Sequence, residues 1–220
     1  MDSMPAKPVN DSDSLKPFRP SPDKADQILA GALKIFTTQG YAAASMDRIA
    51  KAAGVSKPTL YSYFQDKEGL FLALVRHLTQ QCDPLFPHRP AIAELDLPPE
   101  IVLRQLADKA LTGFAQNTAL LTLIRLIIGE SERFPTLAQS FVREIQKPML
   151  ENLATYFGSQ PQLNFPDPMV AARIFAGSLM HFLIVQKLML GEEILPLDGD
   201  RLADGLVAVM MAASSNTVNR

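Results

Sequence analysis

Hydroxyl, phenol and amine side chains are concentrated between residues 56 and 67 of this 220-residue chain. They belong to Ser56, Lys57, Thr59, Tyr61, Ser62, Tyr63 and Lys67, with the ring of Pro58 among them. Side chains of these types hydrogen-bond to base edges and to phosphate oxygens. The sequence contains no nucleophile elbow, phosphate-binding glycine loop or metal-ligand cluster. The pattern therefore favours nucleic-acid recognition over catalysis, and we expect no enzyme activity, cofactor or metal.

Two short helices joined by a glycine turn are predicted to position these side chains. The first begins at the N-cap Ser45 and ends at Gly54, which supplies the positive φ angle of a turn. Its apolar residues recur on one helix face: Met46, Ile49, Ala50 and Ala53. The second helix covers about residues 57–64, with Ser56 as its cap and Pro58 in its first turn. The motif as a whole covers about residues 45–64.

The second predicted helix has a core side and an exposed side. Leu60 and Phe64 form an i, i+4 pair that must face a core, whereas Pro58, Thr59 and Ser62 fall on the opposite side. A helix of this size is on the order of 12 Å long, which matches the width of the major groove. We therefore expect double-stranded DNA as a partner. The alternative is a helix-turn-helix that serves only as packing, with its tyrosines partly buried.

The expected DNA contacts follow from these faces. Pro58, Thr59 and Ser62 are assigned to base edges, and Lys57 and the two tyrosines to phosphates. Asp66 is expected to cap the next helix, which leaves Lys67 and the first N–H groups of that helix near a phosphate. The complete predicted set is Ser45, Ser56, Lys57, Pro58, Thr59, Tyr61, Ser62, Tyr63 and Lys67.

The run from Ile28 to Leu74 resembles the N-terminal domain of the tetracycline-repressor-like (TetR/AcrR) family of bacterial transcription factors. The matching motifs, in order, are Phe36 with Gly40-Tyr41, Ile49-Ala50, Ala53 to Ser56, Leu60 to Phe64, and Lys67 to Leu70. Pro58 stands where a glycine or another small residue is also common. The segment from Arg125 to Ile145 has a weaker resemblance to regulatory domains of the same family. The resemblance implies a helix-turn-helix head, a second helical domain that binds a small molecule, and a dimer that reads a near-palindromic operator.

Charge is unevenly distributed along the chain, although the net charge is only -2. Residues 34–67 carry five basic and two acidic side chains, and residues 79–220 carry 11 basic and 15 acidic ones. The basic excess therefore lies on the helix-turn-helix, as expected for a DNA-binding surface. A purely solvated face is the alternative.

Helix-period apolar stripes and few strand signals predict an all-α protein in four parts. These are a disordered arm (1–22), a helix-turn-helix domain (23–82), a proline-rich loop (83–99) and a helical domain (100–220) for effector binding and dimerisation. Helices are expected near 24–39, 100–116, 120–129, 136–157 with a kink at Pro148, 167–190, and from about 198 to 214. The arm is expected to be a flexible tail, and the alternative is that Lys16 and Arg19 reach the minor groove.

The predicted helix 167–190 is apolar nearly all round, so we expect it to form a homodimer interface with the last helix. The interface candidates are Ile174, Phe175, Ser178, Val185, Leu202, Leu206, Val209 and Met210. A fully internal core helix is the alternative. Its uncharged run, residues 174–186, is only 13 residues long, which we judge too short to cross a membrane.

An effector pocket is expected inside the second domain, for a small hydrophobic or aromatic molecule. The candidate residues are Leu121, Ile124, Arg125, Ile128, Phe141, Ile145, Met149, Leu179, His181, Phe182 and Gln186, of which Arg125, His181 and Gln186 supply polar groups. The apolar residues and His181 equally suit a plain core. We expect a ligand-responsive repressor, with activation as the alternative. An interaction module that has lost DNA binding is a third interpretation, which the presence of Lys57, Tyr61, Tyr63 and Lys67 disfavours.

The single cysteine, Cys82, fits a reducing cytoplasm, which is the expected location. His77 and His88 lie near it in the sequence, but the three residues have no recognised metal-ligand spacing. An ordinary thiol is therefore expected in place of a redox or metal role.

Overall fold

The computed structural model describes residues 22–82 and 97–215, and these residues form helices with no β-strand among them. This confirms the all-α fold. The predicted arm, most of the proline-rich loop, His88 and the side chain of Cys82 lie outside the described residues. The first helices are α1 (Pro22–Ala43), α2 (Met46–Ala52), α3 (Lys57–Tyr63) and α4 (Lys67–Cys82). They are followed by α5 (Pro99–Gln116), α6 (Thr118–Glu130), α7 (Pro135–Phe141), α8 (Lys147–Ser159), α9 (Pro168–Leu183) and α10 (Gly199–Ser215).

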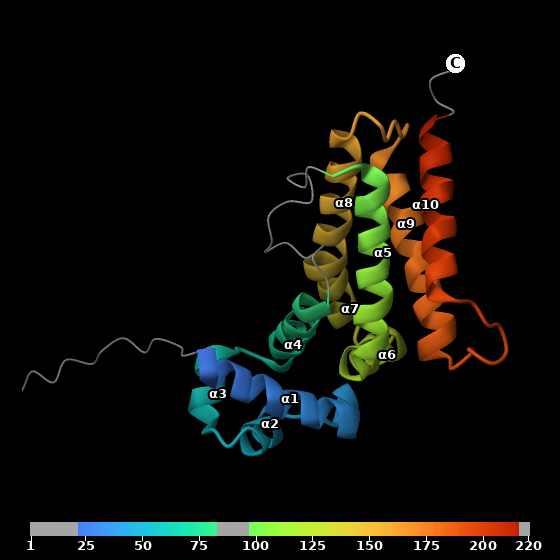
Figure 1. The fold of residues 1–220 in the computed structure, drawn as a ribbon. Coiled ribbons are helices and arrows are strands. Elements are labelled where there is room, and N and C mark those ends of the chain that lie inside the picture. Colours follow the sequence, from blue (N-terminus) through green and yellow to red (C-terminus); the bar gives the residue numbers. More distant parts are fainter. Residues whose placement is uncertain (1–21, 83–96, 216–220) are drawn as a thin grey trace, which may run out of the picture.

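Helices α1, α2 and α3 form a head at the lower end of the molecule, and α4 leads from it to the second domain (Figure 1). The head core contains Phe36, Phe71 and Leu60, all fully buried. A close approach of α1 and α2 holds the motif in place, because a Cβ atom on Gly31 would lie 2.7 Å from the Cβ of Ala53. Only a glycine fits there without moving one helix.

The turn between α2 and α3 has the predicted chemistry. Gly54 has a φ angle of 65°, and the next N–H group, that of Val55, donates to the carbonyl of Ala50 at 3.0 Å. Regular helix α1 is interrupted at Gly40, whose φ angle of 76° lies outside the helical region. Gly40 therefore interrupts α1 before the motif, and Gly54 makes the turn between α2 and α3 within it.

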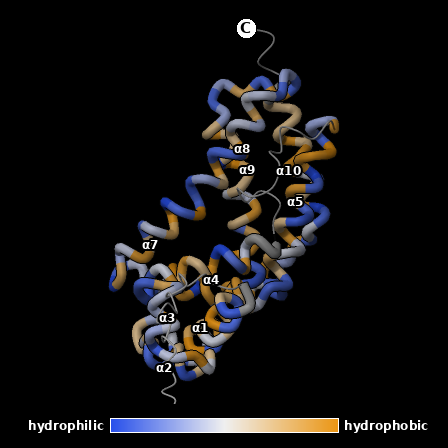
Figure 2. Tube along the Cα trace, turned by 90° about the vertical axis from the view of Figure 1, so that its left-hand side faces the viewer, coloured by the Kyte–Doolittle hydropathy of each residue, from blue (hydrophilic) through white to orange (hydrophobic). Residues whose placement is uncertain are grey.

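The second domain consists of α5, α8, α9 and α10 lying side by side, with α6 and α7 below them near the head (Figure 1). Polar and apolar residues alternate along most helices, as amphipathic packing requires (Figure 2). Its core includes Phe157 and Phe175, whose rings meet edge to face at 6.2 Å. The domain contacts the head through α6, which packs against α1 and α4.

Two π-helical turns interrupt the long helices of the second domain. The predicted helix 136–157 is divided into α7 and α8 by the turn Val142–Gln146, called η2. Pro148 lies two residues beyond this turn, in the first turn of α8, and its missing N–H group and its ring explain why the regular ladder is widened at this point. The second turn, η3 (Ile184–Leu188), extends α9.

Helix α9 with η3 covers Pro168–Leu188 and is long and apolar enough, by length and composition, to cross a membrane. The uncharged run 174–186 is only part of this longer helix, which also contains the charged residues Arg173 and Lys187. About a third of its most apolar window is buried within the chain, where α9 packs against α5, α8 and α10. A core helix of a helical domain has the same properties.

Candidate nucleic-acid interface and internal cavity

Ser45 and Ser56 act as helix caps in the motif. The Ser45 hydroxyl accepts a hydrogen bond from the N–H of Arg48 at 3.4 Å, and the Ser56 hydroxyl accepts one from the N–H of Thr59 at 3.2 Å. Both helices are thus started by local side chains that the sequence identifies. The two caps thus fix where α2 and α3 begin within the head.

The outer face of α3 presents Lys57, Pro58, Tyr61 and Ser62 to solvent. The Tyr61 side chain is 43% exposed. Thr59 is half-buried, and its hydroxyl lies 2.7 Å from that of Ser56. The Ser62 hydroxyl donates to the carbonyl of Thr59 at 2.6 Å. The Ser56 and Thr59 hydroxyls are paired with each other, and the Ser62 hydroxyl, whose hydrogen is given to a carbonyl, retains acceptor positions for an amino group of a base.

Tyr63 is less available than its neighbours. It is half-buried, and its ring packs against that of Phe64 with 6.4 Å between the centroids. Phe64 ends α3 in an extended conformation, with its N–H donating to the carbonyl of Leu60 at 3.0 Å. Tyr63 therefore flanks the exposed face at its inner edge.

Lys57 is paired within the motif. Its ammonium lies 2.7 Å from a carboxylate oxygen of Asp47 on α2, and both side chains are more than half exposed. The hydrogen bond to Asp47 raises the pKa of Lys57, so the amine stays protonated. A phosphate at this position exchanges one exposed ion pair for another, which costs little.

Lys67 is placed differently from the sequence expectation of a phosphate contact. Its ammonium points inward and donates to the carbonyls of Tyr41 and Ala44 at 2.9 and 3.2 Å. Asp66 caps α4 as predicted, since its carboxylate accepts from the N–H of Gly69 at 2.7 Å. The carbonyls at the end of α1 need donors, and Lys67 is the amine within reach.

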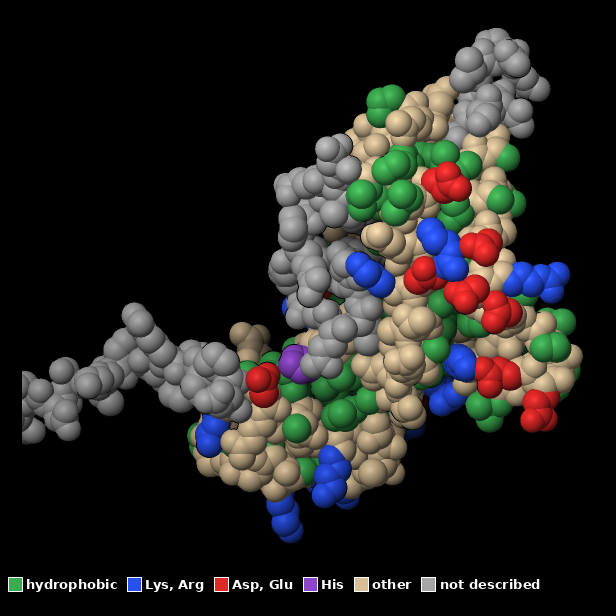
Figure 3. All heavy atoms as spheres, in the orientation of Figure 1, with side chains coloured by type: hydrophobic (Ala, Val, Ile, Leu, Met, Phe, Trp, Pro, Cys, Tyr) green, Lys and Arg blue, Asp and Glu red, His purple; other side chains and the backbone are tan. Residues whose placement is uncertain are grey.

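Two basic residues that were not predicted to lie at the interface are also exposed on α2. They are Arg48, whose guanidinium donates to Gln39 Oε1 at 2.8 Å, and Lys51. In Figure 3, lysine and arginine side chains project from the lower face of the head, whereas most acidic side chains in view lie on the second domain. The excess of basic residues between positions 34 and 67 of the sequence was the feature from which Arg48 and Lys51 could have been predicted to lie at the interface.

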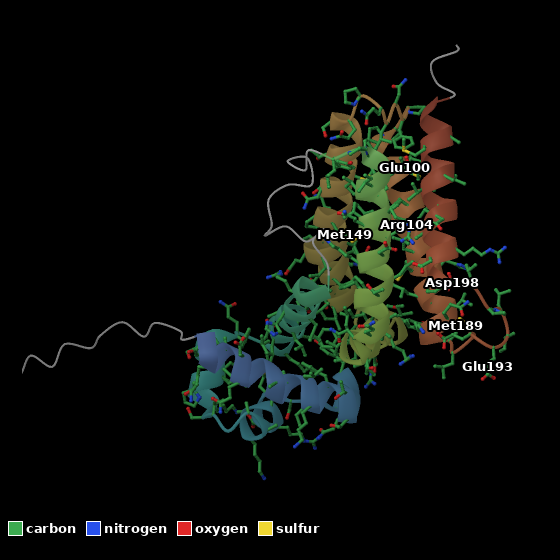
Figure 4. All side chains as sticks on the ribbon, viewed as in Figure 1. Glu100, Arg104, Met149, Met189, Glu193 and Asp198 are labelled. Carbon is green, nitrogen blue, oxygen red and sulfur yellow. The ribbon has the colours of Figure 1, made fainter. Side chains whose placement is uncertain are left out.

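An apolar cavity lies between α5, α8 and α9. Its volume is about 50 Å³, and its walls are Ala110, Phe114, Met149, Leu153, Phe175, Ala176, Leu179, Met180 and Leu183. No charged side chain lines it. Met149, labelled in Figure 4, and Leu179 are the members of the predicted pocket set that line it.

The other residues of that predicted set do not line this cavity. Leu121, Ile124, Ile145 and Phe182 are buried in the core, Phe141 is half-buried, and Arg125, Ile128 and His181 are exposed. The Arg125 guanidinium donates to the carbonyl of Leu188 at 2.9 Å, at the end of η3. Buried Gln186 donates its amide N–H to the carbonyl of Leu195 at 2.6 Å. These two polar groups support the loop after α9.

Tyr156 is a buried polar residue that was not predicted from the sequence. Its side chain is 1% exposed, and its hydroxyl has no hydrogen-bond partner. Burial raises the pKa of Tyr156 to about 12. It follows Leu153 by three residues, so it lies on the same face of α8 one turn beyond the cavity wall. Nothing in the local sequence distinguished it from a core aromatic residue.

The predicted dimer residues fall into two groups. Ile174 and Val209 are 52% and 61% exposed, and Ser178, Val185 and Leu202 are partly exposed. Phe175, Leu206 and Met210 are buried inside the chain. The outer faces of α9 and α10 therefore carry an apolar surface, with the second group packed beneath it.

Among the described residues, no group of three or more histidine, cysteine, aspartate or glutamate side chains is arranged to hold a metal ion. The sequence grouping of His77, Cys82 and His88 extends beyond those residues. His77 itself is half-buried on α4.

Two family models match the chain. The bacterial regulatory proteins of the tetR family match residues 28–74, and the C-terminal domain of the AefR-like transcriptional repressor matches residues 101–214. The HTH-type transcriptional regulator EthR of Mycolicibacterium smegmatis is 33% identical over 102 residues, which are 46% of each chain. This chain thus spans less than half the length of that curated relative.

Solved structures match over a greater length. A TetR-family regulator from Mesorhizobium loti is 28% identical with a TM-score of 0.68, covering 86% of this chain and 96% of its own. The flavonoid-responsive regulator FrrA is 29% identical with a TM-score of 0.65, covering 90% of this chain and 97% of its own. Both domains described above are included in these matches.

Proposed function

Because this chain belongs to the TetR family of DNA-binding transcriptional regulators, which act as dimers, we propose that it is a repressor released from a near-palindromic operator by a small apolar effector. The exposed outer face of α3 is the observation that carries the proposal. It presents Pro58, Tyr61 and Ser62 beside the cation of Lys57, on a helix whose start and end are fixed by caps. A helix presented in this way suits the major groove.

Base reading is assigned to Pro58, Thr59 and Ser62, and phosphate contact to Lys57 and Tyr61. One head covers one half-site only. A near-palindromic operator therefore requires two heads about one DNA turn apart, which a two-fold dimer supplies. The reducing cytoplasm, where bacterial DNA is found, is the proposed location.

The proposed dimer interface is the exposed surface of α9 and α10. Val170 and Ile174 lie four residues apart on α9, and Val209 lies on the outer face of α10. Glycines on both helices, Gly177 and Gly205, have no atom within 4 Å of a Cβ position, so the surface between these side chains is open to a partner helix. Packing of two such helix pairs forms a four-helix interface.

The apolar cavity between α5, α8 and α9 is the proposed effector site. Its walls lack charge, which disfavours a charged group buried there because an unpaired ion in an apolar site is costly. The similar protein FrrA is named as flavonoid-responsive. A neutral aromatic or other hydrophobic effector fits these observations, with the Tyr156 hydroxyl as the nearby buried hydrogen-bonding group.

The cavity of about 50 Å³ is smaller than the several hundred cubic ångströms that a drug-sized ligand occupies. Binding therefore requires the walls to move apart, and the flexible side chains of Met149 and Met180 permit this. Movement of α9 acts on the proposed dimer surface, and movement of α5 acts on α4, against which it packs. An effector that prefers the expanded state thereby shifts the dimer away from the head spacing that DNA needs.

Footprinting on DNA upstream of the protein's own coding region tests DNA recognition. Thr59→Ala is expected to change the base preference at one position of each half-site. Lys57→Ala is expected to weaken binding to all sequences and to lower the salt slope by about 0.9 for each phosphate that the variant no longer neutralises. Lys109→Ala, at an exposed position on α5 outside the head, is the matched control and should leave binding unchanged. Unaltered binding by both α3 variants would refute the proposed docking.

Thermal melting and operator binding with two probes test the effector site. A neutral flavonoid should raise the melting temperature and weaken operator binding, whereas a fatty-acid anion of similar size should do neither. Met180→Trp, which fills the cavity, should abolish the response without loss of DNA binding. Transcription from the operator in vitro then separates repression from activation.

A further inference from the structure

The loop between η3 and α10, residues 189–197, projects from the lower end of the second domain (Figure 1). Five of its nine residues are large, apolar and exposed: Met189 (72%), Leu190 (77%), Ile194 (86%), Leu195 (60%) and Leu197 (37%). Figure 4 labels Met189 at its start and Glu193 near its tip. Apolar side chains gathered in this way on one loop are unusual for a surface that faces only water.

The loop is held in a defined conformation. The N–H of Gly191 donates to the carbonyl of Val185 at 2.8 Å, and the N–H of Leu195 donates to the carbonyl of Gly191 at 2.9 Å. The buried amide of Gln186 binds the Leu195 carbonyl, and Lys187 pairs with Glu192. The exposure of the apolar side chains is therefore a property of an ordered loop.

Leu190 adds a further sign of constraint. Its φ angle is 57°, and it is the non-glycine residue with a positive φ angle among the residues that the structure describes. A left-handed conformation is unfavourable for a residue with a side chain and persists where surrounding contacts impose it. The contacts of Gly191 and Gln186 impose it here, with the Leu190 side chain directed to solvent.

The loop joins α9 to α10, the two helices that carry the exposed apolar residues Val170, Ile174 and Val209. Helix α9 runs down to the loop and α10 runs up from it, so the loop lies at the lower end of both helices (Figure 1). Within the described residues, eight of the 13 exposed large hydrophobic side chains belong to α9, α10 and this loop. These three elements thus carry most of the exposed large apolar side chains of the described residues.

We infer that the loop 189–197 is an arm that packs against the second domain of a second copy of this chain, and this inference rests on the proposed α9–α10 dimer. In a two-fold interface each copy offers the same surface, so each arm lies beside the partner's second domain at the same level. The charges of the loop disfavour an anionic membrane or DNA as its partner. Glu193 is exposed and Glu192 is paired only with Lys187, which leaves the arm acidic and unsuited to an anionic membrane or to DNA.

A tryptophan reporter tests the contact directly, because the chain has no tryptophan of its own. Ile194→Trp places one on the arm, and Val142→Trp places one at a 56% exposed site on η2, away from α9 and α10. As protein concentration rises through the dimerisation range, emission from the arm should shift to shorter wavelength and become less sensitive to acrylamide. Emission from position 142 should not change.

Sedimentation measures the contribution of the arm to dimerisation. Ile194→Ser combined with Leu195→Ser should raise the dimer dissociation constant by about tenfold or more, because the interface then lacks two apolar anchors. Val142→Ser should leave the constant unchanged. The side chains replaced in these experiments are all exposed, so the monomer fold is retained.

The outcomes separate this inference from the proposed dimer. If Ile174→Arg dissociates the dimer but the double serine variant has no effect, the arm is refuted and the α9–α10 interface stands. If the wild-type chain is monomeric at all concentrations, both are refuted. If neutral phosphatidylcholine vesicles shifted the emission of the arm at concentrations where the protein is monomeric, the partner of the arm would be a lipid surface and not a second copy of the chain.

Discussion

The ammonium of Lys67 lies 4.3 Å from the centre of the Tyr41 ring and donates to the backbone carbonyl of that same residue at 2.9 Å. Phe134, between α6 and α7, meets the other side of this cluster, with its ring edge-on to Tyr41 at 5.1 Å. Burial of the amine lowers the pKa of Lys67. The end of α1, the start of α4 and the second domain are thus joined at one cation.

Replacing Lys67 with methionine is expected to reduce stability without changing the salt dependence of DNA binding. The variant leaves the carbonyls of Tyr41 and Ala44 without their donor, which costs about 1–3 kcal/mol. Chemical denaturation and salt titrations of operator affinity measure the two effects. Lys109→Met, at an exposed position on α5 outside the head, is the control for removal of a surface charge. If Lys67→Met instead lowered the salt slope by about 0.9 and left stability unchanged, Lys67 would contact a phosphate, as predicted from the sequence.

Gly31→Ala is expected to destabilise the head by about 1–3 kcal/mol, because its Cβ would lie 2.7 Å from that of Ala53 and 2.7 Å from its backbone nitrogen. DNA binding should weaken at the same time, since α2 is displaced. Gly129→Ala is the matched control, as Gly129 lies inside α6 with no atom within 4 Å of a Cβ position. That substitution should stabilise the protein by up to about 1 kcal/mol. Equal effects at the two sites would contradict the close packing of α1 and α2.

The motif could be predicted from sequence because its signals are local. Ser45 and Ser56 cap helices through N–H groups three residues away, and Gly54 ends α2 by its own φ angle. The partners of Lys67 and Arg125 could not be predicted in this way. They are backbone carbonyls 26 and 63 residues away in the sequence, and carbonyls carry no residue-type signal.

Prediction from the sequence was limited in the second domain as well. Its apolar residues predicted a helical core, but hydrophobicity alone does not separate a core wall from a cavity wall or an outer face. Met149 and Leu179 line the cavity, whereas Ile124 fills the core and Ile128, four residues later, is 55% exposed. The π-helical turn η2 shifts the angular position of the residues after it, which a constant step of 100° per residue does not reproduce.

Raising the pH from about 10 to about 12 is expected to destabilise the protein through its buried tyrosines. The pKa of Tyr156 and that of Tyr41 are both raised to about 12, mainly by burial, from an unfolded value near 10. In this window the unfolded chain has released protons that the folded chain retains, so the free energy of unfolding falls as pH rises. The slope is up to about 1.4 kcal/mol per pH unit for each tyrosine.

Tyr156→Phe isolates one contribution to this pH dependence. At pH 7 the variant should be as stable as the wild type or slightly more stable, because it removes a buried hydroxyl that has no partner. Between pH 10 and 11 it should lose less stability than the wild type in urea denaturation at one protein concentration. Identical slopes for the two proteins would show that Tyr156 ionises normally in the folded state.

Arg125→Ala is expected to loosen the loop 189–197 while leaving the apolar cavity intact. The guanidinium donates to the carbonyls of Lys187 and Leu188 at 3.4 and 2.9 Å, where the end of a helix leaves carbonyls without partners and favours a cation. Removal of these bonds should cost about 1–2 kcal/mol and speed amide hydrogen exchange at Gly191 and Leu195. Arg125→Lys keeps the charge and should retain part of the protection. Because no part of Arg125 lines the cavity, the affinity for a neutral flavonoid should be unchanged. If the affinity fell while hydrogen exchange in the loop stayed normal, Arg125 would orient the ligand, as predicted from the sequence.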